Sequence, residues 1–141
     1  RPPKDTTHVV LDTPAGLHGK KLDAVVKSVH RVLVPLQPSI FDILATRAFL
    51  DLLLEEKAVR KQQTFVAVVG MRVDARTRAA HELARIVEGL DVPVLGFLRD
   101  TQLYVQLAAH GLTLFDLSPA RAEKDLAPWQ GIIDWVEAPL T

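Results

Sequence analysis

The centre of this sequence is the run FVAVV at Phe65–Val69, which carries five apolar residues in succession. A short, continuously apolar run is typical of a strand that helices cover on both faces. Three further short runs have this character, at Val9–Asp12, Val32–Leu36 and Val92–Phe97. We therefore predict four strands.

Longer amphipathic segments alternate with these runs, an order typical of right-handed βαβ units. The sequence thus predicts an α/β fold, a mostly parallel sheet flanked by helices on both faces, as in P-loop NTPase or Rossmann-like three-layer domains. Its 141 residues suit a single domain. The expected helices are Leu17–Val29, a segment that begins after Ser39, a segment from after Asp74 to about Glu88, Thr101–His110, and a segment that begins at Ser118 with Pro119 and is interrupted by Pro128.

The clearest of these helices follows Ser39. Ser39 can cap the helix, and Asp42 lies three residues further on, as in a capping box. Apolar residues then recur at helical spacing, namely Phe41, Leu44, Ala45, Ala48 and Leu52.

Composition narrows the possible classes of protein. Lys and Arg together number 17, as do Asp and Glu, so overall charge indicates no nucleic-acid or membrane partner. No apolar stretch reaches the roughly 18 residues that a membrane span needs. The sequence has no Cys, which excludes disulfides and thiolate catalysis and fits a cytoplasmic protein. Because the chain starts at Arg1 and reaches its first run within a few residues, we expect it to be the later part of a longer polypeptide.

The first apolar run ends on Asp12 and breaks at once into a Thr-Pro-Ala-Gly turn at residues 13–16. In open α/β sheets, ligands bind outside the carboxyl ends of the strands, where this carboxylate would lie. There it could hold Mg²⁺ through water, as in nucleotide-hydrolysing proteins. Alternatively, Asp12 caps the helix that follows. The run alone does not decide between these interpretations.

Two more loops are expected at the same edge of the sheet. Pro35–Ser39 follows the second strand, and its two prolines make it rigid. Leu98–Thr101 follows the fourth strand. Three loops that converge on one edge favour a binding site there.

Basic residues form two groups that could contact DNA phosphates. The interpretation that we favour is an ordinary solvated helix face, given the balanced charge. The first group is Arg72, Arg76, Arg78 and Arg85, and the second is Lys57, Arg60 and Lys61.

Three motifs, in their order along the chain, resemble one family. Asp12–Gly16 (DTPAG) resembles the DTPPG or DSPAG switch of the ParA/MinD deviant-Walker ATPases. Val34–Asp42 (VPLQPSIFD) is similar to the VPVQPSPLD segment of the small ParA proteins that act in partitioning. Arg99–Leu112, with Tyr104, Ala108, Ala109 and Gly111, is similar to a further stretch of that subgroup.

The resemblance implies a P-loop ATPase that forms a homodimer around two ATP molecules, binds DNA or another surface non-specifically, and responds to a ParB-like or adaptor protein. Asp12 would be the Walker B acid that organises Mg²⁺. Thr13, Pro14 and Gly16 would belong to the switch II loop near the γ-phosphate. Residues near the adenine would be Leu98, Arg99 and Asp100, with Met71 and Arg72 on the neighbouring loop.

The sequence departs from the family in three respects. The glycine-rich Walker A loop with its lysines is absent from these residues, as is the switch I acid, and both belong upstream. Met71 stands where many relatives carry an adenine-reading Asn. We therefore expect the C-terminal part of such an ATPase, incomplete at its N-terminus and nearly inactive alone. A non-hydrolysing scaffold of the same fold and an unrelated doubly wound domain for a small ligand are the alternatives.

Overall fold

Three parallel strands form the centre of the computed structural model, which describes residues 1–140. The strands are β1 (Arg31–Leu36), β2 (Phe65–Val73) and β3 (Val94–Arg99), and they lie in that order. β2 pairs with both of its neighbours in parallel register. Its middle residues Ala67 and Val68 are completely buried. The predicted α/β architecture with a parallel sheet is confirmed.

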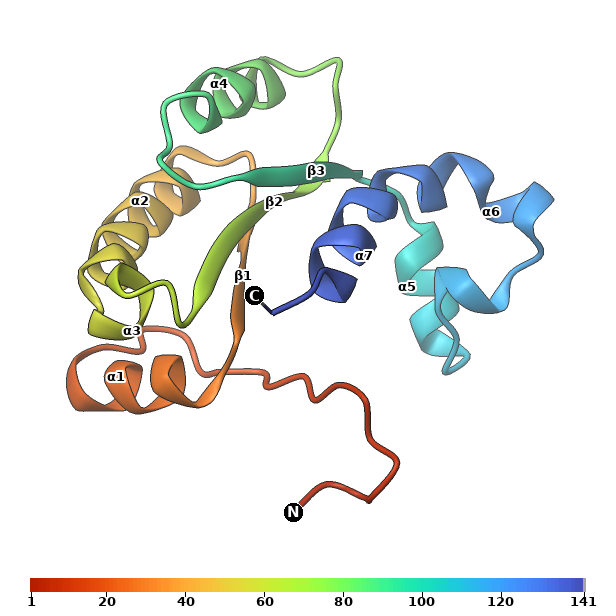
Figure 1. Ribbon diagram of the computed structural model, residues 1–141. Helices are drawn as coiled ribbons and strands as arrows, with labels where there is room; N and C mark the ends of the chain where they lie inside the picture. Colours follow the sequence, from red (N-terminus) through yellow and green to blue (C-terminus); the bar gives the residue numbers. More distant parts are fainter. Residues whose placement is uncertain (141) are drawn as a thin grey trace.

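Four helices cover one face of the sheet (Figure 1). They are α1 (Gly19–Ser28), α2 (Ile40–Glu55), α3 (Lys57–Arg60) and α4 (Arg78–Val87). Both crossovers between strands run in the same direction across the sheet, and right-handed crossovers then place α2 and α4 on the same side. The larger core lies between these helices and the strands, and its least exposed members include Val26, Leu36, Leu53, Val68 and Leu83.

The C-terminal part of the chain returns to the opposite face, where its last helix packs against β2 and β3. It consists of α5 (Leu103–Ala109), a 3₁₀ turn at Leu114–Asp116, α6 (Pro119–Leu126), a 3₁₀ turn at Ala127–Trp129 and α7 (Gln130–Glu137). The interruption predicted at Pro128 is confirmed, because α6 and α7 are separate helices. A smaller core joins the sheet to α7, built on the buried residues Val69, Leu98 and Ile132.

Two glycines allow this C-terminal part to approach the backbone of β3 closely. A Cβ on Gly131 of α7 would overlap the carbonyl oxygen of Leu95. A Cβ on Gly96 of β3 would lie 2.9 Å from the carbonyl oxygen of Pro128. Since neither neighbour is the end of a flexible side chain, the contact requires glycine on both sides.

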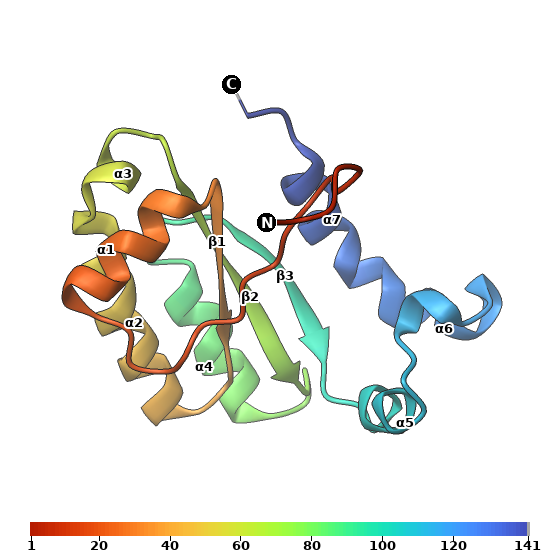
Figure 2. The ribbon, with the colours of Figure 1, turned by 90° about the horizontal axis from the view of Figure 1, so that it is seen from below.

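The predicted strand at Val9–Asp12 is wrong. A strand requires a neighbour that completes its hydrogen bonds. β1 pairs with β2 alone, and within residues 1–140 no strand lies along its other edge. Residues 9–12 are therefore extended but unpaired, and Val10 is 92% exposed. Figures 1 and 2 show this red segment passing β1 on its way to α1.

The other strands are confirmed with altered ends. β2 continues through Gly70 to Val73, beyond the predicted end at Val69. β3 begins at Val94 rather than Val92. Pro93 has no N–H to donate, although its carbonyl oxygen still accepts a hydrogen bond from the N–H of Val68.

The predicted helices are also present, but two details of α2 differ. Ser39 occupies the N-cap position, yet its side chain makes no capping hydrogen bond, so the predicted capping box is wrong. The helix buries Ile43, Leu50 and Leu53, and the apolar repeat that predicted it is not the side that packs on the sheet. The members of that repeat, Phe41, Leu44, Ala45, Ala48 and Leu52, are all exposed.

The contact between α7 and β3 makes a specific stability prediction. Gly131→Ala places a methyl group against a backbone carbonyl, so we expect the free energy of unfolding to fall by about 1–3 kcal/mol, as in other overpacked cores. Gly89→Ala is the matched control, because a Cβ there lies 3.6 Å from its nearest neighbour, and we expect a change within about 0.5 kcal/mol. Urea unfolding followed by circular dichroism measures both. Equal stability of the two variants would contradict the close approach.

Candidate functional site

The carboxyl ends of the three strands form the candidate site, since parallel strands end at the same edge of the sheet. The segment after β1 is Gln37–Ser39, where the Ser39 N–H donates to the carbonyl oxygen of Gln37 at 2.9 Å before α2 begins. The segment after β3 contacts the last residue of β2. The Asp100 N–H donates to the carbonyl oxygen of Val73 at 3.1 Å.

Arg72, near the end of β2, and Asp100, directly after β3, are brought together at this edge. The Arg72 Nε lies 3.5 Å from the Asp100 Oδ1, and both side chains are well exposed. Arg72 has a φ of +52°, in the left-handed region that non-glycine residues seldom adopt. A strained backbone at such a position is a feature of many functional sites.

Met71 and Leu98 lie in the smaller core. Leu98 is buried, and Met71 is half-buried against the core that contains Val69 and Ile132. Their side chains therefore serve the packing of the sheet on α7. They offer no polar group to a ligand.

Arg99 forms a two-pronged ion pair with Asp125 of α6. Its Nε donates to the Asp125 Oδ1 at 2.9 Å, and its Nη2 donates to the Oδ2 at 3.0 Å. Asp125 is only 5% exposed. The hydrogen bonds from the guanidinium hold the pKa of this carboxyl below its usual range, although burial alone would raise it. Sequence reasoning missed Asp125, whose signal is its spacing of three residues from the buried Ala122 on the inner side of α6.

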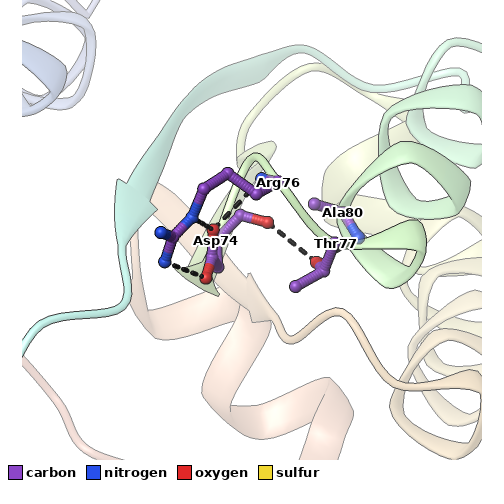
Figure 3. Close-up of polar contacts among 4 residues, drawn as sticks. All are labelled: Asp74, Arg76, Thr77 and Ala80. Carbon is purple, nitrogen blue, oxygen red and sulfur yellow. Dashed lines mark hydrogen bonds and ion pairs between the residues drawn. The ribbon is translucent and has the colours of Figure 1, made fainter.

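The loop after β2 is closed by a second network (Figure 3). The Asp74 carboxylate accepts hydrogen bonds from the Arg76 side chain at 3.0 and 2.9 Å and from the Arg76 backbone N–H at 3.1 Å. The Thr77 hydroxyl donates to the carbonyl oxygen of Asp74 and accepts from the N–H of Ala80, which caps α4. The Arg76 side chain, and then its N–H, lower the pKa of Asp74 from 3.8 to about 2.

Asp12 lies apart from these pairs on the exposed N-terminal segment. Thr13 and Pro14 are exposed, the chain turns at residues 15–16, and Gly16 has a φ of +72°, so the predicted turn is present. The Gly16 carbonyl oxygen lies 2.8 Å from the His18 Nδ1. In residues 1–140, no group of three or more His, Asp or Glu side chains is placed to hold a metal ion.

Three of the four arginines in the first basic group have carboxylate partners. Besides the Asp100 and Asp74 pairs of Arg72 and Arg76, the Arg85 Nη2 lies 2.6 Å from the Glu82 Oε2. A carboxylate partner partly neutralises an arginine, so these three side chains attract phosphates less strongly than unpaired arginines would.

No protein-family model matches this chain, and no curated protein matches its sequence. Among the helices of residues 1–140, none is long and apolar enough to cross a membrane. The fold itself places the chain in the class of α/β domains with a three-stranded parallel sheet.

Replacing the buried carboxylate tests the Arg99–Asp125 pair. Asp125→Asn keeps the shape but removes the charge, so we expect the free energy of unfolding to fall by about 1–3 kcal/mol near neutral pH. Folding lowers the pKa of Asp125, so the pair stabilises the protein above the ordinary carboxyl pKa and is lost as pH falls through the folded value. The difference between the two proteins should therefore shrink in acid. Glu123→Gln, at an exposed position of α6, should change stability by less than about 0.5 kcal/mol.

Removing the guanidinium beside Asp74 tests the second network. Arg76→Gln should raise the pKa of Asp74 from about 2 part of the way to 3.8, because the backbone N–H still donates. In the original protein, the contribution of Asp74 to stability is complete above about pH 4 and is lost as pH falls toward 2. Carbon NMR of the carboxyl group reports the titration. Arg78→Gln should leave it unchanged, and an unchanged titration in Arg76→Gln would overturn the assignment.

Proposed function

We propose that this chain is the C-terminal portion of a cytoplasmic ParA/MinD-type partitioning or positioning ATPase. The intact protein would bind MgATP, form a homodimer, bind DNA or another surface non-specifically, and respond to a ParB-like or adaptor protein. The observation that carries this proposal is the order of three motifs along a parallel sheet. Val34–Asp42 spans the end of β1 and the start of α2, and Arg99–Leu112 spans the end of β3 and α5. Asp12–Gly16 precedes both.

The free edge of β1 supports the same proposal. In a ParA-type domain, the strand that leads into the Walker A loop lies in the middle of the sheet. Within residues 1–140, β1 has an unpaired edge, and the apolar residues Val9, Val10 and Leu11 pass it without a partner strand. A strand from upstream of Arg1 would pair with that edge and give residues 9–12 a neighbour.

The residues present fit only part of a MgATP site. The Asp12 carboxylate is exposed and has the oxygen chemistry that Mg²⁺ prefers, directly or through water. The chain supplies no glycine-rich cradle of backbone N–H groups and no lysine for the β- and γ-phosphates. Under this proposal Asp12 positions the metal, and the phosphate contacts come from upstream sequence.

Met71 favours a second candidate function, a scaffold of the same fold without nucleotide chemistry. Its half-buried side chain packs on the core with Leu98 and Ile132 and offers no hydrogen bond to a base. Arg99, expected near the adenine, donates hydrogen bonds from its Nε and Nη2 to Asp125, so these two groups are not free for a base. Such a scaffold would keep its protein-binding surfaces but would not bind or hydrolyse ATP.

The DNA-binding part of the proposal rests on the second basic group, Lys57, Arg60 and Lys61 at α3. Within residues 1–140, none of these three side chains lies within 4.0 Å of a carboxylate, unlike most of the first group. Their charge is therefore available for phosphate contacts.

The proposal is tested in the full-length protein by Asp12→Asn. Loss of the metal-positioning carboxylate should reduce Mg²⁺-dependent ATP turnover by about 100-fold or more, because the charge that organises the metal is gone. Asp5→Asn, on the same exposed segment, is the matched control and should have no effect. Unchanged turnover in Asp12→Asn would refute the assignment of Asp12. A coding sequence without a glycine-rich lysine loop upstream would refute the ATPase and leave the scaffold.

A further inference from the structure

α2 has apolar side chains on two opposite sides. The inner side packs against the sheet through Ile43, Leu50 and Leu53. The outer side is exposed over its whole length, with Phe41 81%, Leu44 57% and Leu52 51% accessible to solvent. We call this outer side the outer stripe, and its members are Phe41, Leu44, Ala45, Ala48 and Leu52.

The outer stripe is one continuous face. Residues at spacings of three, four and seven lie above one another on a helix, so these five positions form a single band. Nothing in residues 1–140 covers it. A contiguous exposed apolar band on a protein surface commonly marks an interaction site.

The distribution of side-chain size along the stripe fits a second copy of the same helix. Large residues lie toward both ends, whereas Ala45 and Ala48 lie between them. If two copies of α2 cross in antiparallel fashion about a two-fold axis level with the peptide between Ala48 and Phe49, Leu52 of each copy lies opposite Ala45 of the other. Large side chains then meet small ones, which lets the helices approach closely.

The charges beside the stripe are complementary in the same arrangement. Arg47 and Asp51 flank one side of the stripe, four residues apart, and both are exposed. Neither lies within 4.0 Å of an oppositely charged group in residues 1–140. The same two-fold axis brings Arg47 of each copy within one residue of the level of Asp51 of the other, a spacing that these long side chains bridge, so two ion pairs form at the rim of the contact.

We propose that two copies of this chain associate through the outer stripe of α2, antiparallel and about a two-fold axis between Ala48 and Phe49. The contact needs no nucleotide and is separate from the ATP-dependent dimer of the proposed function. Its extent is about one helix face on each copy, so the dimer is weak and concentration-dependent.

Disulfide cross-linking tests the geometry, because the chain contains no Cys. Ala48→Cys places two thiols near the axis, within the roughly 4–7 Å between Cα atoms that a disulfide needs. Phe41→Cys lies seven residues away, so its two copies are about 20 Å apart in the antiparallel pair. Without nucleotide, Ala48→Cys should cross-link at least about ten times faster than Phe41→Cys or the exposed α5 control Val105→Cys. Equal rates, or faster linking through residue 41, would overturn the proposal.

Sedimentation of the nucleotide-free chain tests the energetics. Leu44→Glu should raise the dissociation constant about ten-fold or more, whereas Val105→Glu, 62% exposed on α5, should leave it unchanged. Arg47→Glu and Asp51→Arg should each weaken the dimer, and the double exchange should restore it. The proposal would be overturned if the chain stayed monomeric at about 1 mM, or if Leu44→Glu left the dissociation constant of the dimer unchanged. Because ATP is absent, neither result bears on the ATPase proposal.

Discussion

The close contact between β3 and α7 is the constraint on which the rest of the structure depends. With strands in the order β1-β2-β3, both right-handed crossovers place their helices on one face. The other face is covered only if the chain after β3 returns across it. Gly96 and Gly131 allow that return, because neither has a Cβ atom at the point where the backbones of β3 and the C-terminal part approach each other closely. The smaller core of Val69, Leu98 and Ile132 follows from it.

The return of the chain also determines what the edge of the sheet can offer a ligand. α6 brings Asp125 to Arg99 at the end of β3, and the resulting pair fixes a residue that the family resemblance would place near adenine. Packing on α7 takes Met71 and Leu98 into the core. The polar groups that remain exposed at this edge include Arg72 and Asp100. Under the proposed function, this edge would support a nucleotide site that upstream sequence completes, and would not hold a nucleotide alone.

Local pattern was enough to predict β1, β2, β3 and the helices, because their apolar runs and turn residues are consistent with one another. It failed at Val9–Asp12, where strand formation depends on a neighbour that residues 1–140 do not supply. It predicted α2 but identified only its exposed stripe, since both sides of this helix are apolar. At the site, the family resemblance assigned Arg72 and Asp100 to the surroundings of the same ligand group, but no sequence pattern predicted the ion pair between them. The Arg99–Asp125 pair joins residues from two elements and has no local pattern.

Within residues 1–140, the sheet ends at β1 and leaves residues 9–12 without a partner strand. Hydrogen–deuterium exchange of the 141-residue chain measures this most directly, because an amide outside a ladder exchanges without opening of the fold. We expect the amides of Val9, Val10 and Leu11 to exchange at nearly the rate of an unstructured peptide, while those in the middle of β2 are the most protected. Protection of residues 9–11 equal to that of β2 would contradict the account.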